Sequence, residues 1–453
     1  MSNKNGDVVQ DYELEEPGPD AIDARPTKEL FIEMLTKDIT LTEAINDLVD
    51  NSTDGAKRLR RGGRFDNLWI HITANSDALE VEDNCGGLEA DIARHYAFRF
   101  GRPKGSTNTV GSVGLFGVGM KRTFFKTGSF FRVESNAETS SFLLEVDVDD
   151  WTEDANRWAF PFHEDQPRIN RLGGAKGTKI TINKLKAGIG AQFSDPIFIK
   201  QLAISMRKAQ QEAISKGLAI RLNGTHLVAD IPTLISSQDI RPIYISEKVT
   251  HLDRPPVHKK LYIGLGASSR NSAGWYIYCN GRLVVDADKS LTTGWGAASP
   301  TAQLPEYHNQ FAKFRGYVFL DADDPSMLPY NTTKSGIDTE APLFKSLRSE
   351  MIDTARPVFD FLNDLKEASE NSTDVPLIET AVTQAKEVAL DKIEESREFV
   401  RPSAATISKP NKRISFTRPS DMVDKAMEQM GVTTNKAVGE HAFDYYYEAE
   451  CAD

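Results

Sequence analysis

The segment from Leu41 to Arg61 limits most narrowly what this chain can fold into, because its apolar residues recur at helical spacing. Thr40 and Glu43, which precede and open it, have the spacing of a capping box, so we expect a helix to begin here. The stripe predicted to face the core consists of Ile45, Val49, Ser52, Ala56 and Leu59. A helix with this stripe must pack against another layer of structure.

The other side of the same helix carries two carboxylates and an amide within two turns, at Asp47, Asn51 and Asp54. Their oxygen atoms are hard ligands of the kind that Mg²⁺ accepts, and Mg²⁺ usually retains waters and bridges to phosphates. Taken alone, the pattern is more often a solvated polar face, since acidic amphipathic helices are common.

A second pattern follows two predicted strands at 68–74 and 78–83. The second strand ends in Asp83, and the turn after it has the sequence NCGG and ends at Gly87. Glycines let the backbone approach a flat ligand closely, and a buried carboxylate there can accept a hydrogen bond from an exocyclic amine such as that of adenine. Taken alone, such a sequence is more often a plain strand-to-helix turn.

A third pattern is the glycine-rich stretch VGSVGLFGVGMKR, which leads into a helix predicted to run toward Lys126. Such backbone at a helix N-terminus offers N–H groups to phosphate oxygens. The stretch is neither a Walker A loop nor a dinucleotide-binding fingerprint, and its interleaved apolar residues disfavour a flexible polar linker. A fourth pattern, Gly177-Thr178 at the start of a predicted strand, has no meaning alone.

Together, the four patterns resemble the N, G1, G2 and G3 boxes of the GHKL ATPases, the class of gyrase, heat-shock chaperones, histidine kinases and mismatch-repair ATPases. The sequence DLVDNSTDG at 47–55 is similar to the first box, DNCGG at 83–87 to the second, and GLFGVG at 114–119 to the third. The resemblance covers about residues 27–185 and implies a Bergerat-type α/β sandwich that binds ATP with Mg²⁺. The layout is most similar to bacterial microrchidia-like and gyrase-B-like ATP-binding proteins.

The resemblance implies a role for each matching residue. Asn51 would coordinate Mg²⁺, Asp54 would support the base of the pocket, and Asp83 would bind the adenine amino group with Thr178 nearby. The stretch 99–113 would form a lid over the nucleotide. The remaining nucleotide-binding positions implied by the boxes are Gly87, Phe116, Gly117, Val118, Gly119, Met120 and Lys121.

One departure from the family concerns catalysis. Hydrolysing members have Glu as general base four positions before the asparagine, whereas this chain has Asp47, which is one methylene shorter. Because attack geometry is sensitive on the scale of about 1 Å, hydrolysis could be slow, use a shifted water, or depend on Glu43 one turn earlier. Cys85, where the family often has Gly, is a lesser departure. The resemblance therefore implies ATP binding more firmly than hydrolysis.

A second α+β unit is expected from about Phe193. Its predicted strands IRLNG (220–224) and GWYIYCNGRLVV (274–285) resemble the transducer domain of gyrase-type, mismatch-repair-type and microrchidia-type members. There a loop lysine reaches the γ-phosphate, and Lys334 in the loop 327–338 is our candidate. The alternative is a lysine in a surface turn.

We therefore expect an α+β fold that begins with a Bergerat-type ATPase sandwich and continues into a transducer-like α+β domain and a helical C-terminal region. The predicted segments are a flexible arm (1–26), the ATP-binding domain (27–190), the transducer-like domain (191–340), a helical region (341–400), a linker rich in Pro, Ser and Lys (401–419) and a short tail (420–453).

Composition excludes several classes of protein. No run of about 18 apolar residues is present that would span a membrane, and the polar, acidic N-terminus is not a secretory signal. The formal net charge of −12 argues against a uniformly basic nucleic-acid-binding protein. The three cysteines are far apart, which indicates neither a zinc site nor a disulfide framework and fits a reducing cytosol. We expect a cytoplasmic protein.

Two functions remain open from the sequence. The first is an ATP-driven clamp, in which the N-terminal arms pair two protomers and Lys334 senses the γ-phosphate, with DNA or a protein as partner. The second is an interaction module with little turnover, which Asp47 motivates and in which the aromatic tail FDYYYEAE recruits an effector. The basic cluster of Lys57, Arg58, Arg60, Arg61 and Arg64 is either a DNA contact or, more often, a solvated helix end.

Overall fold

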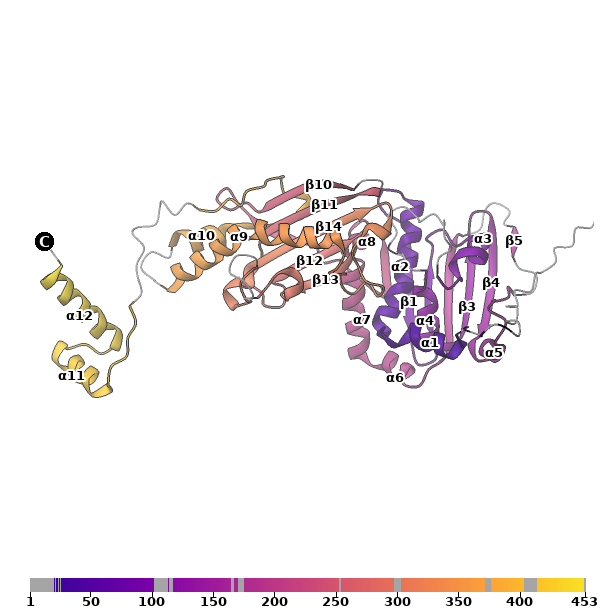
Figure 1. Cartoon of the computed structure of the whole chain (residues 1–453), viewed down its shortest axis with the longest axis horizontal. Helices are drawn as coiled ribbons and strands as arrows, with labels where there is room; N and C mark the ends of the chain where they lie inside the picture. The colour runs from indigo at the N-terminus through magenta and orange to yellow at the C-terminus, as the bar shows by residue number, and fades with distance from the viewer. Residues whose placement is uncertain are drawn as a thin grey trace, which may run out of the picture. The chain divides into compact units, whose positions relative to one another are not determined.

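The computed structural model describes residues 20, 22, 24, 26–101, 113, 117–163, 167–169, 175–251, 254–296, 303–370, 376–402 and 414–451. The chain separates into two compact units. The first comprises Met1–Lys366 and Ile378–Pro402, and the second comprises Glu367–Leu377 and Ser403–Asp453. Figure 1 labels the helices and strands.

The amino-terminal part of the first unit is built on a mixed sheet, which has eight strands within the described residues, in the order β5-β4-β3-β6-β2-β1-β7-β8. The strands are β1 (Trp69–Ala74), β2 (Leu79–Asp83), β3 (Gly128–Asn136), β4 (Ser140–Asp147), β5 (Arg168–Ile169), β6 (Gly177–Leu185), β7 (Ala219–Leu222) and β8 (Thr225–His226). The pair β1–β7 is parallel, and the other neighbours are antiparallel.

Helices cover this sheet and form one apolar core with it (Figure 1). They are α1 (Lys28–Lys37), α2 (Leu41–Leu59), α3 (Ala90–Ile92), the π-helical turn Ala93–Ala97, α4 (Gly119–Thr127), α5 (Val148–Glu153), α6 (Ile189–Ser194), α7 (Pro196–Ala209) and α8 (Gln211–Ser215). The Thr40–Glu43 capping box forms at the start of α2 as predicted. Ile45 and Val49 of α2 are fully buried in this core, and Phe124 of α4 stacks on Phe131 of β3.

The second part of the first unit is a five-stranded sheet, as far as the described residues show, in the order β10-β11-β14-β12-β13. Its strands are β10 (Ile243–His251), β11 (Arg254–Leu265), β12 (Gly274–Cys279), β13 (Arg282–Asp288) and β14 (Phe314–Ala322). Helix α9 (Pro342–Glu370) lies along the sheet (Figure 1), and Phe359 of α9 packs on Trp295 and Phe314. Single turns of 3₁₀-helix occur at Leu291–Thr293, Asn309–Lys313, Pro325–Met327 and Leu390–Lys392.

These observations confirm the predicted α+β fold, with three corrections in detail. The strand predicted at 220–224 as part of the second domain is β7, which pairs with β1 and so belongs to the first sheet. The region 341–400 is not helical throughout. After α10 (Pro376–Gln384), strand β15 (Lys386–Ala389) pairs with β9 (Thr233–Ser236), and Leu390 is buried in an aromatic cluster of the second sheet. Tertiary pairing there outweighs local helix propensity.

A third correction concerns the end of α2. Leu59, predicted to face the core, is 46% exposed. It is the last residue of the helix, where the chain enters the turn at 60–63.

The second unit contains α11 (Ser420–Met430) and α12 (Asn435–Glu450), joined by a turn in which Gly431 has a positive φ. Aromatic side chains of α12 are exposed, among them Phe443 and Tyr445. Among the helices that the structure describes in either unit, none combines the length and apolar character required to cross a membrane.

Candidate functional site

The carboxylates of α2 are inside the protein and not on a solvated face. Asp47, Asp50 and Asp54 are at most 5% exposed, whereas Asn51 between them is exposed. A buried carboxylate must be paired or hydrogen-bonded to remain charged. The partners of these three residues therefore define the site.

Asp47 accepts a hydrogen bond from a cation on each of its oxygens. Lys334 Nζ lies 3.0 Å from Oδ1, and Arg122 Nη2 lies 3.0 Å from Oδ2. Arg122 comes from α4, and the same nitrogen donates to the carbonyl of Thr332, 3.0 Å away. Lys334 comes from the loop after β14 and has a φ of 55°, so the loop holds this residue in the left-handed region that is uncommon outside glycine.

Asp50 forms the second half of this ion-pair network. Its Oδ2 accepts from Lys334 Nζ at 2.8 Å, and its Oδ1 accepts from Gln210 Nε2 at 2.6 Å. Burial acts to raise the pKa of Asp50, but the charges of Arg282 and Lys334 lower it on balance. Burial acts to lower the pKa of Lys334, but Asp47 and Asp50 raise it well above its usual value. Lys334 and Asp50 are therefore both charged at neutral pH.

Asp83 lies at the end of β2, where the sequence predicts the adenine acceptor. Ser52 Oγ donates to its Oδ2 at 2.6 Å, and the Cys85 N–H donates to its Oδ1 at 2.7 Å. Burial raises the pKa of Asp83, although these hydrogen bonds oppose the shift. The register of β2 and β6 sets Thr178 opposite Asp83, and both line a cavity of about 440 Å³ together with Asn136.

Gly87 ends the turn after Asp83 with a φ of +70°, and a Cβ there would lie 2.2 Å from the carbonyl oxygen of Asn136. Any side chain at this position would collide with the backbone of β3. The sequence predicts that the backbone of this turn approaches a flat ligand closely. At Gly87 the structure shows the close approach to β3, a strand of the same sheet.

Asp54 holds the backbone that leads into the glycine-rich stretch. Both of its oxygens lie 3.0 Å from the N–H of Val113, which donates to them. The carbonyl of Val113 accepts from the hydroxyl of Tyr330, 3.1 Å away, in the second sheet's loop. Asp54 thus fixes the backbone at Val113.

Within the glycine-rich stretch the structure describes Val113 and the residues from Gly117 onward. Phe116 and most of the lid expected at 99–113 lie outside the described residues. Val118 precedes α4, and Gly119 begins it so close to Asp47 that a Cβ on Gly119 would lie 2.9 Å from Oδ2. Met120 is half-buried against the core. The N–H groups in the first turn of a helix have no acceptor within the helix and can face phosphate oxygens.

Two candidate side chains are engaged elsewhere. The ammonium of Lys121 is buried and donates to the carbonyls of Ala97, at 2.7 Å, and of Gly117. Glu43 Oε2 accepts from both the N–H and the hydroxyl of Thr40, each at 2.8 Å. Burial acts to raise the pKa of Glu43, but the hydrogen bonds from Thr40 and Ser335 lower it on balance.

The donor set fits a nucleotide with a single magnesium contact from the protein. Asn51 presents an exposed amide beside buried carboxylates, and Mg²⁺ typically takes one or two protein ligands together with phosphates and waters. Within the described residues, no group of three or more His, Cys, Asp or Glu side chains could hold a metal, so a metal here would depend on such external ligands. Asp83 supplies a buried acceptor for an amine at the end of the sheet.

A mixed sheet covered by helices, with this constellation, defines a nucleotide-binding domain. Residues 39–178 match the family described as histidine kinase-, DNA gyrase B-, and HSP90-like ATPase. A comparison of the sequence with curated proteins found no match. Residues 39–178 thus form an ATPase domain of the GHKL class, and this segment contains all four sequence patterns.

Sequence reasoning missed Arg122 and the role of Asp50. Arg122 lies three positions after Gly119, one helical turn into α4, and nothing in its spacing marks it as a partner of Asp47. Asp50 is part of the first box, but its partners Gln210 and Lys334 are distant in sequence. Only the packing of α4, Gln210 and the second sheet's loop against α2 reveals both roles.

Proposed function

We propose that this protein is a Mg-ATP-dependent ATPase whose nucleotide drives a conformational switch, in a clamp formed by two copies of the chain. One observation carries the proposal: Lys334, from the loop after the second sheet, contacts Asp47 and Asp50 of the ATPase domain. Because Lys334 connects the loop of the second sheet to the ATPase domain, its contacts can change when the ATPase domain binds a nucleotide.

Bound Mg-ATP supplies the scissile phosphate and the cation that draws charge from it. Asn51 is proposed to bind the metal and Asp83 to accept a hydrogen bond from the adenine amino group, beside Thr178. The first turn of α4, from Gly119, and the turn at Gly117 are proposed to face the phosphates. These residues orient the nucleotide, and orientation is a large part of catalysis in phosphoryl transfer.

Asp47 is the proposed general base, in preference to Glu43, because the Glu43 carboxylate is occupied by Thr40. Lys334 and Arg122 occupy both oxygens of Asp47. An anion at the γ-phosphate position would compete for Lys334. Transfer of that lysine to the anion would leave Oδ1 of Asp47 able to take a proton from water. The same transfer would release Asp50 and move the loop that carries Lys334.

A second candidate is a nucleotide-gated interaction module that binds ATP with little hydrolysis. The pairing of Asp47 with two cations favours it, because each oxygen of this carboxylate already accepts a hydrogen bond from a cation. In that case the exposed aromatic residues of α12 would recruit an effector protein.

The wider architecture belongs to the same proposal. We propose an ATPase domain that extends through β8, a transducer-like domain to about residue 340, and a C-terminal tail from 420 that contacts an effector or DNA. The N-terminal arm, of which residues 1–19 lie outside the described residues, is proposed to pair two protomers in the cytoplasm.

The test is steady-state ATP hydrolysis by the wild type, Asp47→Ala and Asn51→Ala, with and without duplex DNA, together with light scattering with and without ATP. The clamp ATPase predicts turnover that both substitutions abolish and an ATP-dependent dimer. The interaction module predicts ATP binding that only Asn51→Ala removes, with negligible turnover in the wild type. Absence of ATP binding by folded wild-type protein at millimolar nucleotide would refute both.

A further inference from the structure

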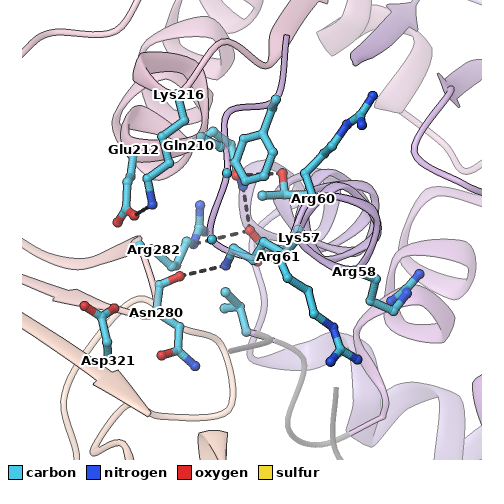
Figure 2. A pocket seen from close by; sticks show the side chains of 18 of the residues that line it. Lys57, Arg58, Arg60, Arg61, Gln210, Glu212, Lys216, Asn280, Arg282 and Asp321 are labelled. Carbon is cyan, nitrogen blue, oxygen red and sulfur yellow. Dashed lines mark hydrogen bonds and ion pairs between the residues drawn. The ribbon is translucent and has the colours of Figure 1, made fainter. Parts of the chain in front are cut away.

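A second cavity, of about 330 Å³, opens between the carboxyl end of α2 and the turn that joins β12 to β13 (Figure 2). It shares Asp50 and Val113 with the surroundings of the nucleotide site, but Asn51 and Asp83 do not line it. Among the described residues, its wall carries more cationic than anionic side chains. The cationic ones are Lys57, Arg58, Arg60, Arg61, Lys216 and Arg282.

Arg282 is held in place by the turn that precedes it. Asn280 and Gly281 have φ values of 48° and 78°, which is the signature of a two-residue hairpin with both central residues left-handed. The side-chain amide of Asn280 exchanges two hydrogen bonds with the backbone of Ala322, at 2.8 and 3.1 Å. The tip of the hairpin is therefore fixed to β14, and Arg282 has little freedom to turn away.

Two nitrogens of the Arg282 guanidinium are buried without hydrogen-bond partners. Arg282 is 7% exposed, and its Nε and Nη1 have no partner among the described residues. The nearest carboxylate oxygen, Oδ1 of Asp50, lies 3.7 Å from Nε, which is beyond hydrogen-bond distance. That oxygen is already occupied by Gln210. Buried donors are rarely left without a hydrogen-bond acceptor in proteins, and the exceptions include groups that a water, an ion or a ligand completes.

In the part of the chain that the structure describes, the six cationic side chains of the cavity outnumber its four carboxylates, which are Asp50, Glu212, Asp321 and Asp323. Lys57 lies beside Arg282 in Figure 2, and its Nζ donates to the carbonyl of Asn280 at 2.7 Å. On the opposite side, Glu212 is paired with Lys216, and burial raises the pKa of Asp321. These two carboxylates therefore oppose an anion at Arg282 only weakly. The volume is at the lower end of the range for small-molecule sites.

We propose that this cavity is a second ligand site, separate from the nucleotide site, that binds a small phosphomonoester. The phosphate accepts from Nη1 of Arg282, which has no acceptor among the described residues, because a hydrogen bond from a charged donor to a phosphate oxygen is stronger than one between neutral groups. Asp321 and Glu212, which Figure 2 shows across the cavity from Lys57, are placed to accept from hydroxyl groups of the ligand. A sugar phosphate combines both kinds of group.

The experiment is calorimetric titration of the full-length protein with inorganic phosphate and, separately, with ribose 5-phosphate. Neither probe carries an adenine, so neither can use Asp83. We expect binding at millimolar concentration or tighter, with ribose 5-phosphate the stronger ligand. Arg282→Gln should weaken both probes at least about tenfold, because charged hydrogen bonds are lost. Arg356→Gln, which removes an arginine paired with Asp353 on α9, should have no effect.

Arg61→Gln is a second variant that keeps the test decisive if Arg282→Gln fails to fold, because Arg61 is exposed at the rim of the cavity. It should weaken phosphate severalfold through loss of charge. The proposal is overturned if wild-type protein binds neither probe at millimolar concentration, or if Arg282→Gln binds them as the wild type does. It is also overturned if Asn51→Ala, and not Arg282→Gln, removes phosphate binding, since the ion would then occupy the nucleotide site.

Two further measurements distinguish this cavity from the nucleotide site and from a nucleic-acid contact. Titration of Arg61→Gln with Mg-ATP should give wild-type affinity, because Arg61 lines this cavity and, within the described residues, contacts none of those proposed to bind the nucleotide. If the wild-type protein does not bind Mg-ATP, the proposed ATPase function is refuted. The result for the phosphate probes does not depend on that outcome. If Arg282→Gln reduces binding of duplex DNA and leaves the small probes unaffected, the surface is a nucleic-acid contact and the small-molecule proposal fails.

Discussion

Lys334 Nζ lies 3.0 Å from Oδ1 of Asp47, although 287 positions separate the two residues in the chain. Both side chains are at most 6% exposed. This ion pair closes the loop of the second sheet onto the central helix of the ATPase domain. Because this ion pair is buried, we expect its removal to change the free energy of unfolding and its release by a ligand to move the loop.

Lys334→Met should lower the free energy of unfolding by about 3–5 kcal/mol, because it leaves two buried carboxylates without their shared cation. Urea denaturation of the full-length protein measures the change. Lys345→Met is the matched control, since Lys345 pairs with Glu340 on the surface, and its effect should not exceed about 1 kcal/mol. Equal effects of the two substitutions would show that the buried contact does not form in solution.

Asp47→Asn should reduce the turnover number for ATP by about 10²–10⁴-fold, because the proposed proton acceptor is removed. Nucleotide affinity should stay within a few-fold of the wild type, because Asn51 and Asp83 are unchanged. Single-turnover hydrolysis and equilibrium binding measure the two effects. Glu43→Gln is the control, since glutamine can also complete the capping box. Turnover lost in Glu43→Gln and retained in Asp47→Asn would reverse the assignment of the base.

Gly119→Ala should displace the carboxylate of Asp47, because the added Cβ would lie 2.9 Å from its Oδ2. We expect lower turnover and a loss of about 1–3 kcal/mol in stability, as for other overpacked sites. Gly439→Ala in α12 adds the same methyl group where nothing lies within 4 Å, so turnover should not change. Wild-type activity in Gly119→Ala would mean that Asp47 is not confined against α4.

Asp83→Asn should weaken ATP binding at least about tenfold. The amide N–H that replaces a carboxylate oxygen cannot accept the hydrogen bond from the adenine amino group. The substitution should also stabilise the protein at pH 7 by about 0.5–2 kcal/mol. Burial raises the pKa of Asp83 in the folded chain. When the pKa of a carboxyl group is higher in the folded chain than in the unfolded chain, the free energy of unfolding decreases as pH rises. The decrease begins near the pKa in the unfolded chain, about 3.9, and ends above the pKa in the folded chain.

The gain from Asp83→Asn should therefore be full at neutral pH and should shrink as pH decreases toward about 4. Thermal unfolding at several pH values measures it. Asp77→Asn, at an exposed turn, should alter neither ATP affinity nor stability. A stability difference for Asp83→Asn that grows in acid would contradict the raised pKa.

Local pattern made several features predictable. The Thr40–Glu43 spacing located the start of α2, and the glycine pattern located the start of α4. The alternation at 68–74 and 78–83 located β1 and β2 within one residue of their ends. These features depend on contacts between residues a few positions apart, whose geometry is fixed by the period of a helix or a strand.

The sequence by itself determined the class of the ATPase domain and the order of its four boxes, because each box is a local run whose residue types and spacing are visible in the chain. Only the tertiary structure decided that Arg122 and Lys334 share Asp47, that β7 joins the first sheet, and that 386–389 form a strand. These outcomes bring together residues that are far apart in sequence. They depend on how sheets and helices pack around buried charge, and spacing along the chain does not encode that.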